Sequence, residues 1–370
     1  MFKQYQFRNY RFKLVILVYL LTTIGILVIG SAEKGYQSQQ IIGLVLGSAA
    51  LLICSLMDYN IFMNLHWLVY GFNLLLLLVV ISSLGKEVNG AQRWLEIIPG
   101  VLQIQPSELA KILLILFFAK FFSDKSEKIN DFKTIVISVL LFAVPAVLIL
   151  KEPDLSTTIT IALIFCSMIF VAGFSYRYIG GIFAVLAPIM PLFLSYVMRE
   201  DQKLLSDYQR GRIMAWLNPA KYADKAYQQQ NSIMAIGSGQ LAGKGLNNNA
   251  VASVKNADYI VEPQTDFIFA VAGEELGFVG TAAIILLLLL IVIEIIMIGR
   301  NAKDLSGNLI CCGVAAWIGF QGFINICVAT GLMPNTGVPL PFVSYGLTSL
   351  ASLYIAIGIV LNVGLQPRKY

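Results

Sequence analysis

Residues 266–298 read DFIFAVAGEELGFVGTAAIILLLLLIVIEIIMI, and this stretch decides the fold. As a single helix, its 33 residues would extend roughly 50 Å at about 1.5 Å per residue. The hydrocarbon layer of a membrane is only about 30 Å thick. The first half is interrupted by three glycines, Gly273, Gly277 and Gly280. We therefore expect a short helix from Asp266 to about Leu276, buried in protein near the outer surface, and then the true crossing from Phe278.

The composition of the whole chain agrees with a membrane protein. Of the 370 residues, 58% are apolar and 13% are charged, with a mean hydropathy of +0.76 and a net charge of +5. Runs of about 20 apolar residues favour helices over barrel strands, so we expect an all-α polytopic membrane protein. The five cysteines lie in apolar runs without a CxxC pattern, which argues against disulfide, zinc or haem sites.

Ten apolar segments are candidate membrane spans, and we treat residues 1–370 as one membrane domain. The approximate bounds of the spans are 14–30, 40–57, 66–84, 106–122, 133–150, 155–173, 178–198, 266–298, 308–330 and 344–364. One polar segment, 199–265, separates spans seven and eight. It is too polar to cross the membrane and too long for a simple turn, so we expect a functional loop there.

The distribution of basic residues predicts the orientation. Lysines and arginines cluster before span one, between spans four and five, after span eight and after span ten. The positive-inside rule puts these positions in the cytoplasm, with both termini. Residues 85–105, 150–154, 199–265 and 332–343 then face outward, so we expect a multi-pass plasma-membrane protein whose active site faces outward.

Two polar clusters begin predicted spans on this outer side. In QPSELAK, residues 105–111, Pro106 suits a first helical position, and Glu108 and Lys111 share a helix face. Inserting a lone lysine into a membrane span costs about 2.5–3.5 kcal/mol, so Lys111 should have a partner. A purely structural pair with Glu108 and a functional role explain the two charges equally well. In KEPDLSTT, residues 151–158, Pro153 suggests a helix start with Asp154 in the first turn, where an acid stabilises the helix dipole.

Further polar groups lie in or beside the long loop. Arg210 and Arg212 flank a glycine and could hold a phosphate through forked hydrogen bonds. Lys244 lies in a glycine-rich turn that lacks the Walker spacing, so a nucleotide P-loop is not expected. Locally, Asp266 could simply follow a helix cap at Thr265, and two further acids, Glu274 and Glu275, could be paired inside the bundle.

Taken together, these segments resemble the SEDS family (shape, elongation, division and sporulation), whose best-known members are RodA, FtsW and SpoVE. Seven segments carry the resemblance in chain order: NGAQRWLEI (89–97), QPSELAK (105–111), EPDLSTT (152–158), YQRGRI (208–213), IGSGQLAGKGL (236–246), TDFIFAVAGEELGFVG (265–280) and GVPLPFVSYG (337–346). Because the chain is compact and lacks long terminal tails, it looks closer to RodA than to the other paralogues.

The resemblance implies a peptidoglycan glycosyltransferase that polymerises lipid II, an undecaprenyl-pyrophosphate-linked disaccharide-pentapeptide, for cell-wall elongation and shape. It implies a class B penicillin-binding protein as partner. The family's catalytic aspartate matches Asp266, which we assign as general base of an inverting reaction. Substrate-binding candidates are Arg210, Arg212, Lys244, Lys111, Arg93 and Glu108; Asp154, Glu274 and Glu275 are assigned to structure. A divalent cation, Mg²⁺ or Mn²⁺, could assist, but no convincing ligand set is visible.

Some positions depart from the family pattern, and some interpretations stay open. Relatives often read QPDLGT where this chain has EPDLST, and VSYGGS where it has VSYGLTS. These departures leave any role carried over to Glu152 in doubt. Alternative functions are a lipid II flippase, a division or sporulation paralogue, and a non-catalytic scaffold. A flippase would need polar groups through the whole membrane depth, whereas here they cluster on the outer side.

Overall fold

The computed structural model describes residues 5–88, 91–98, 102–199, 202, 205, 207–247 and 262–366. Ten of its helices coincide with the ten segments that the sequence predicts to be spans. They are α1 (Phe12–Ala32), α2 (Lys34–Leu56), α4 (His66–Ile81), α5 (Pro106–Asp124), α6 (Phe132–Lys151), α7 (Leu155–Ala172), α8 (Tyr176–Val197), α11 (Ile268–Arg300), α12 (Leu305–Ala329) and α13 (Leu347–Leu365). The remaining helical elements are short: η2 (Phe7–Asn9), α3 (Asn60–Asn64), η3 (Ser126–Lys128), α9 (Asp207–Leu217) and α10 (Ala223–Ser238).

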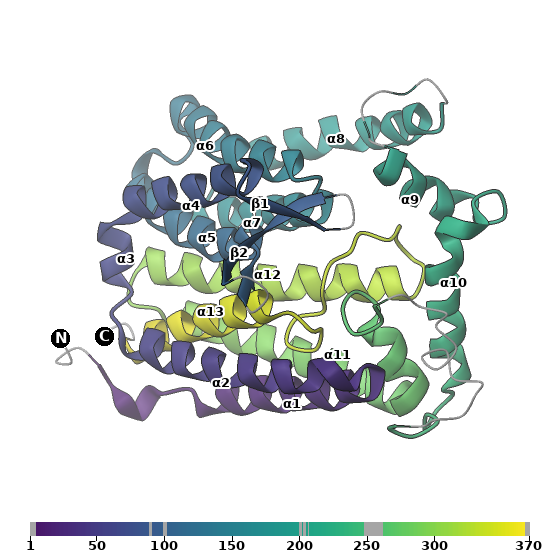
Figure 1. Ribbon diagram of the computed structural model, residues 1–370. Helices are drawn as coiled ribbons and strands as arrows, with labels where there is room; N and C mark the ends of the chain where they lie inside the picture. Colours follow the sequence, from purple (N-terminus) through teal and green to yellow (C-terminus); the bar gives the residue numbers. More distant parts are fainter. Residues whose placement is uncertain are drawn as a thin grey trace.

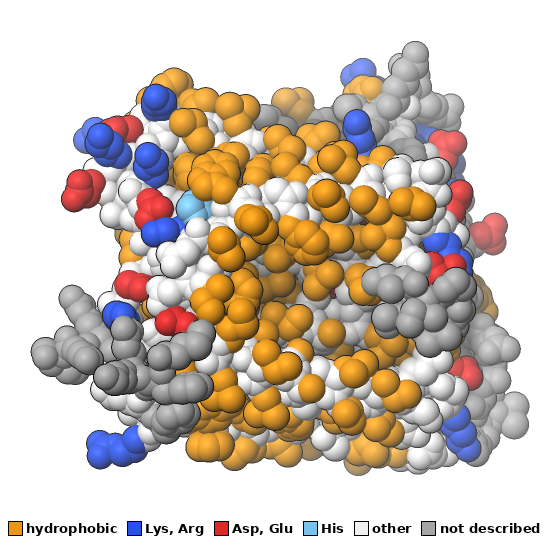
Figure 2. Space-filling view, turned by 60° about the vertical axis from the view of Figure 1, so that its left-hand side comes forward, with side chains coloured by type: hydrophobic (Ala, Val, Ile, Leu, Met, Phe, Trp, Pro, Cys, Tyr) orange, Lys and Arg blue, Asp and Glu red, His pale blue; other side chains and the backbone are white. Residues whose placement is uncertain are grey.

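The prediction of an all-α polytopic membrane protein is confirmed. Among the described residues, seven helices are long and apolar enough to cross a membrane, and α4 is a shorter apolar helix. The count of ten spans remains a prediction. Figure 2 shows a broad hydrophobic band between two ends where charged side chains gather, which is the surface that a bilayer would cover.

The long helices run side by side as one bundle (Figure 1). Helix α13 packs along α2, α11 along α12, and α12 along both α7 and α5. At one end of the bundle, η2 lies beside the end of α13, where the amide of Gln6 donates to the carbonyl of Leu365 at 2.9 Å. Helices α9 and α10 lie across the opposite end (Figure 1), which we call the α10 end.

The core of the bundle is aromatic in one region. Four buried phenylalanines follow one another along α5, at Phe117, Phe118, Phe121 and Phe122. The ring of Phe118 packs against Phe165 of α7 with centroids 4.8 Å apart, and Phe165 stacks on Phe142 of α6 at 4.5 Å. These contacts fix α5, α6 and α7 relative to one another, and α5 and α7 begin near the α10 end.

Helix α11 is broken where the sequence predicts a break. Gly277 has φ 65° and ψ −163°, a conformation open almost only to glycine. The turn of residues 239–245 fills the break, with the amide of Phe278 donating to the carbonyl of Gln240 at 2.8 Å and that of Gly245 to the carbonyl of Glu275 at 2.9 Å. The expected break is therefore confirmed, although the short helix begins at Ile268 rather than Asp266, and the membrane crossing from Phe278 stays a prediction.

The segment 85–105 contains a small sheet that the sequence analysis missed. Strands β1 (Gly85–Val88), β2 (Ala91–Ile98) and β3 (Leu102–Ile104) pair antiparallel in the order β1-β2-β3. The register pairs Lys86 with Trp94 and Leu95 with Ile104. The sheet carries Arg93 on its central strand and leads directly into α5.

Part of the long polar segment 199–265 is helical and docks onto the bundle. The indole nitrogen of Trp216 on α9 donates to the carbonyl of Gly331 at 3.0 Å. Gln229 on α10 donates to the carbonyls of Val328 and Met333 at 2.8 and 2.7 Å. The segment after α12, residues 330–346, is thereby held under α9 and α10, and we call it loop 330–346.

Candidate functional site

Asp266 lies in a turn immediately before α11, at the α10 end. The hydroxyl of Ser344 donates to the carbonyl of Thr265 at 2.6 Å, and Asn325 of α12 donates to the carbonyl of Asp266 at 2.8 Å. The same Asn325 amide nitrogen donates to the carbonyl of Val338 at 2.7 Å. The prediction that Thr265 caps the helix is wrong, because α11 begins at Ile268 and the Thr265 hydroxyl donates to the carbonyl of Glu262. These bonds hold Asp266 by its backbone and do not use its carboxylate.

Gly337 brings loop 330–346 against both Asp266 and Arg212. A methyl group built on Gly337 would lie 3.2 Å from Oδ2 of Asp266 and 3.4 Å from Nη1 of Arg212. Gly337 also has φ 74°, which favours glycine. Because this glycine carries no side chain, the carboxylate that precedes α11 and the guanidinium of α9 can approach the same point of the loop.

The electrostatic surroundings of Asp266 make it a stronger base than an ordinary aspartate. Burial raises the pKa of Asp266 above its usual value, and the charges of Glu262 and Asp154 raise it further. The positive charges of Arg212 and Arg93 oppose this rise and lower the pKa. Such a carboxylate holds a proton more tightly once it has accepted one, as a general base requires.

Arg93 anchors the sheet to the turn between α6 and α7. Its Nε donates to the carbonyl of Glu152 at 3.0 Å, and its Nη2 donates to the carbonyl of Pro153. Asp154 is the N-cap of α7 rather than a first-turn residue, and its carboxylate accepts from the amide and hydroxyl of Thr157 at 3.0 and 2.9 Å. The charges of Arg93 and Asp154 both reach Asp266, so this turn belongs to the surroundings of the site.

Glu108 and Lys111 form the buried pair that the sequence predicts. Nζ of Lys111 lies 2.5 Å from Oε1 of Glu108 and 2.7 Å from Oε1 of Gln321, and both charged side chains are almost fully buried. Gln321 in turn donates to the carbonyl of Pro339 at 2.9 Å and accepts from Trp317 at 2.7 Å. The pair therefore supports loop 330–346 from inside the bundle.

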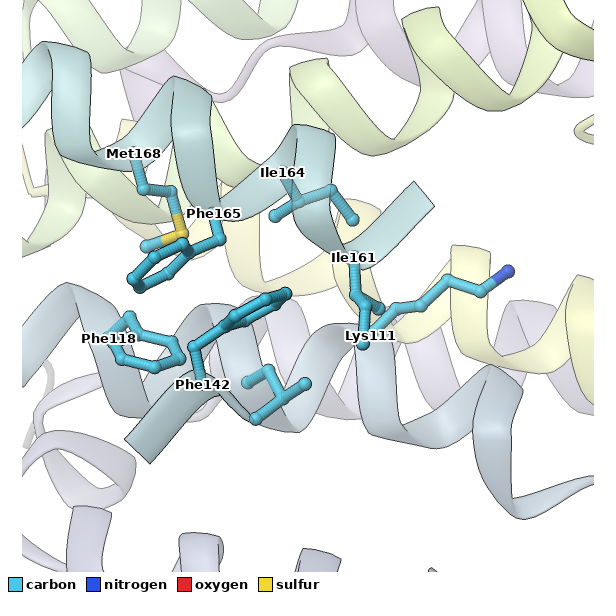
Figure 3. A pocket seen from close by; sticks show the side chains of 8 residues that line it. Lys111, Phe118, Phe142, Ile161, Ile164, Phe165 and Met168 are labelled. Carbon is cyan, nitrogen blue, oxygen red and sulfur yellow. The ribbon is translucent and has the colours of Figure 1, made fainter. Parts of the chain in front are cut away.

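The stem of Lys111 borders an apolar pocket between α5, α6 and α7 (Figure 3). The pocket has a cavity volume of only about 10 Å³, and its other lining residues are Leu114, Phe118, Phe142, Ile161, Ile164, Phe165 and Met168. In Figure 3 the ammonium group of Lys111 points away from the three phenylalanines. The apolar side chains thus nearly fill this space, and the charge of Lys111 is directed to Glu108 and Gln321.

Two of the predicted substrate-binding cations, Lys244 and Arg210, bind groups of the protein itself. Lys244 binds Glu274, with Nζ 2.7 Å from Oε1, and its amide donates to the carbonyl of the same residue at 3.0 Å. Glu275 accepts from the hydroxyl of Ser31 on α1 at 2.5 Å. Arg210 donates through Nε to the carbonyl of Val197 at 3.1 Å. Glu274 and Glu275 are therefore paired in the bundle, as the sequence analysis considered, and Lys244 joins the break in α11.

Sequence reasoning missed three residues of this site. Asn325 and Gly337 contact Asp266 from positions far along the chain, and although Gly337 opens the segment GVPLPFVSYG, no local pattern places either residue beside Asp266. Glu152, left in doubt from the sequence, is 1% exposed beside Arg93. Within the described parts of the chain, no group of three or more His, Cys, Asp or Glu side chains could hold a metal ion. The described residues thus do not fit a resident divalent cation.

Comparisons with known proteins agree with this architecture. The family model of cell cycle proteins that covers FtsW, RodA and SpoVE matches residues 11–369. A Geobacter metallireducens protein named "Probable peptidoglycan glycosyltransferase FtsW" is 34% identical over 97% of this chain and 96% of its own length. A protein of the same name from Nitrosomonas europaea is 35% identical over 82% of this chain and 76% of its own length.

Solved structures resemble the chain over nearly its whole length. A chain from a structure described as "Structural coordination of polymerization and crosslinking by a peptidoglycan synthase complex" has a TM-score of 0.79 at 29% identity, covering 96% of this chain and 97% of that one. The rod shape determining protein RodA of Thermus thermophilus has a TM-score of 0.71 at 28% identity, covering 98% of both chains.

Proposed function

Because this chain belongs to the cell cycle protein family of FtsW, RodA and SpoVE, we propose that it is an inverting glycosyltransferase that polymerises lipid II into glycan strands. The reaction takes place at the outer face of a bacterial plasma membrane. The curated relatives are named peptidoglycan glycosyltransferases and the similar complex is a peptidoglycan synthase, which supports this activity. The observation that carries the proposal is the convergence of Asp266 and Arg212 on Gly337.

In this mechanism Asp266 is the general base. The 4-hydroxyl of the acceptor sugar attacks the anomeric carbon of the donor, the bond from that carbon to the pyrophosphate oxygen breaks, and Asp266 takes the hydroxyl proton. General base catalysis of this kind contributes about 10²–10⁴ in rate. A direct displacement inverts the anomeric centre without a covalent glycosyl-enzyme.

Arg212 stabilises the charges of the reaction. The leaving pyrophosphate gains negative charge, and a guanidinium can hold it through paired hydrogen bonds. The same positive charge keeps Asp266 ionised by lowering its pKa. Arg93, on the sheet, contributes its positive charge. Lys111, which is paired with Glu108, binds Gln321, and Gln321 in turn holds loop 330–346.

The proposed partner is a class B penicillin-binding protein that crosslinks the new strand. Support comes from the similar synthase complex, in which polymerisation and crosslinking are coordinated. The curated relatives that we cite are named FtsW, which favours a role in division over the elongation role expected from the sequence. We place both termini in the cytoplasm and the site on the outer side, in keeping with the basic residues.

A flippase is the second candidate, because Lys111 and Glu108 place charges inside the bundle. Their neutralisation of each other favours a structural role instead. The test combines two assays on purified protein: glycan polymerisation from labelled lipid II, with and without a class B partner, and lipid II translocation in vesicles. We expect polymer without translocation. Translocation without polymer would replace this function by transport.

A further inference from the structure

Glu152 is a buried carboxyl group with no hydrogen-bond partner in the described part of the chain. It is the C-cap of α6, and its side chain belongs to a residue that is 1% exposed. Among the described residues, neither Oε1 nor Oε2 meets a hydrogen-bond donor or acceptor. A buried polar group without a partner destabilises a fold by about 1–3 kcal/mol. A group from outside the described residues can therefore form a hydrogen bond with the carboxyl group of Glu152.

The charged groups that face Glu152 come from three elements. Arg93 of β2 donates to the carbonyls of Glu152 and Pro153, so its guanidinium is fixed beside the turn. Asp154, before α7, is occupied by Thr157 and by Gln105, whose Nε2 lies 3.5 Å from Oδ2. Lys151, on α6 itself, is exposed. The carboxyl group of Glu152 thus has two charged neighbours. They are Arg93, whose guanidinium is held by two carbonyls, and Asp154, whose carboxylate already accepts hydrogen bonds.

These surroundings keep Glu152 protonated at neutral pH. Burial raises the pKa of Glu152 to about 9, with a further rise from the charge of Asp154 and an opposing effect from Arg93. Below that pH the carboxyl is neutral and one oxygen carries a proton. A neutral carboxylic acid is a hydrogen-bond donor, whereas a carboxylate only accepts.

Glu152 adjoins the site that contains Asp266. The charges of Arg93 and Asp154 act on both carboxyls. Further along the same segment, the hydroxyl of Ser156 donates to the carbonyl of Thr336, and the next residue of that loop is Gly337, beside Asp266. Arg93 is itself only partly buried, so an anion that binds its guanidinium would lie near the buried carboxyl group of Glu152.

We propose that the O–H of Glu152 donates a hydrogen bond to an oxygen of the pyrophosphate of the bound donor, next to the charge of Arg93. This inference rests on the proposed function and adds a binding residue to it. No proton is transferred: the acid stays intact while the pyrophosphate oxygen accepts. An ionised Glu152 would repel the same anion, which gives a physical reason for a site that holds the acid neutral.

Two neutral variants test the hydrogen bond. Glu152→Gln keeps a donor of the same shape, whereas Glu152→Met keeps the length and removes the donor. Neither leaves a buried charge, so both should fold, which thermal unfolding in detergent checks. The probe is farnesyl pyrophosphate, with farnesol as the control that lacks phosphate, and affinity is measured for the full-length protein.

We expect Glu152→Gln to bind farnesyl pyrophosphate about as well as the wild type does. Glu152→Met should bind it about ten- to a hundred-fold more weakly, the loss expected for a hydrogen bond to a charged group. Farnesol should not distinguish the three proteins. Affinity of the wild type should fall as pH rises through about 9, and that of Glu152→Gln should not.

Equal affinity in Glu152→Met and the wild type would overturn the proposal and leave a buried water as the partner of Glu152. An alkaline loss that persists in Glu152→Gln would overturn it as well. Infrared spectra supply an independent readout, since the wild type should show a protonated carboxyl band at neutral pH that Glu152→Gln lacks. If this binding pattern holds but lipid II is not polymerised, the proposed function fails and the anion site stands. If all three proteins polymerise lipid II with equal KM, the proposed function stands and the anion site at Glu152 fails.

Discussion

At the scale of single residues, Arg212 and Asp266 are coupled by charge. Arg212 lowers the pKa of Asp266 against the effect of burial. Removing this positive charge should therefore raise that pKa and protonate the base over a wider range of acidic pH. The coupling predicts a shift in the pH dependence of activity, a readout that a purely structural arginine would not produce.

We predict that Arg212→Gln moves the acidic limb of the kcat/KM profile to higher pH, so that the loss of activity is greatest at low pH. The matched control is Arg210→Gln, two residues away on α9. Arg210 donates to the carbonyl of Val197 and is not among the described charges that shift the pKa of Asp266. An unmoved limb in Arg212→Gln, or an equal shift in both variants, would contradict the coupling.

At the scale of elements, the break in α11 depends on Gly277. Its φ and ψ suit glycine alone, and a methyl group there would lie 2.3 Å from the amide nitrogen of Gly243 and 2.7 Å from the carbonyl oxygen of Leu241. Both of these are backbone atoms of the turn that holds Lys244 on Glu274. The break therefore joins the long segment 199–265 to the helix that follows Asp266.

We predict that Gly277→Ala lowers the free energy of unfolding by at least about 1–3 kcal/mol, the strain of a side chain in this conformation. Gly237→Ala in α10 is the control, because a methyl group there meets no heavy atom within 4 Å. In a helix this change should stabilise by up to about 1 kcal/mol. Thermal unfolding in detergent measures both, and equal melting temperatures would show that the break is not strained.

At the scale of the whole molecule, the proposed orientation in the membrane rests on the distribution of charged residues alone. Glu127 is exposed in the turn between α5 and α6, and Asn218 is exposed between α9 and α10 at the opposite end. We predict that a cysteine at position 218 reacts with a membrane-impermeant maleimide in intact cells, whereas one at position 127 reacts only after permeabilisation. Labelling is compared with that of the unsubstituted chain. The inverse pattern would refute the outward-facing site.

Much of this architecture could be predicted from periodicity and local chemistry. The helical segments, the break at Gly277 and the pairing of Glu108 with Lys111 each follow from spacing along one helix. The contacts that complete the site do not, because they join residues far apart in the chain. Neither the approach of Gly337 to Asp266 nor the partner of Lys244 has a local signal.

The small sheet was missed for a different reason. Strands β1 to β3 are short and lie between two apolar helices, so their alternation is too brief to distinguish from a loop. Asp154 was predicted to lie in the first turn of a helix that starts at Pro153, whereas it is the N-cap of α7, an error of the size expected at helix ends. The state of Glu152 depends on burial between elements, which only the fold reveals.

The account as a whole depends on Asp266 accepting the proton of the attacking hydroxyl. A carboxyl whose pKa is higher in the folded than in the unfolded state destabilises the fold once the pH exceeds its unfolded value of about 3.9. Asp266→Asn should therefore be at least as stable as the wild type at neutral pH, so a loss of activity would report chemistry rather than unfolding.

The most direct measurement is polymerisation of labelled lipid II by purified Asp266→Asn, assayed beside the wild type with the same class B partner. The account predicts that the variant folds and binds its partner normally, and that its rate falls by about a hundred-fold or more. Glycan strands made by Asp266→Asn at the wild-type rate would contradict it.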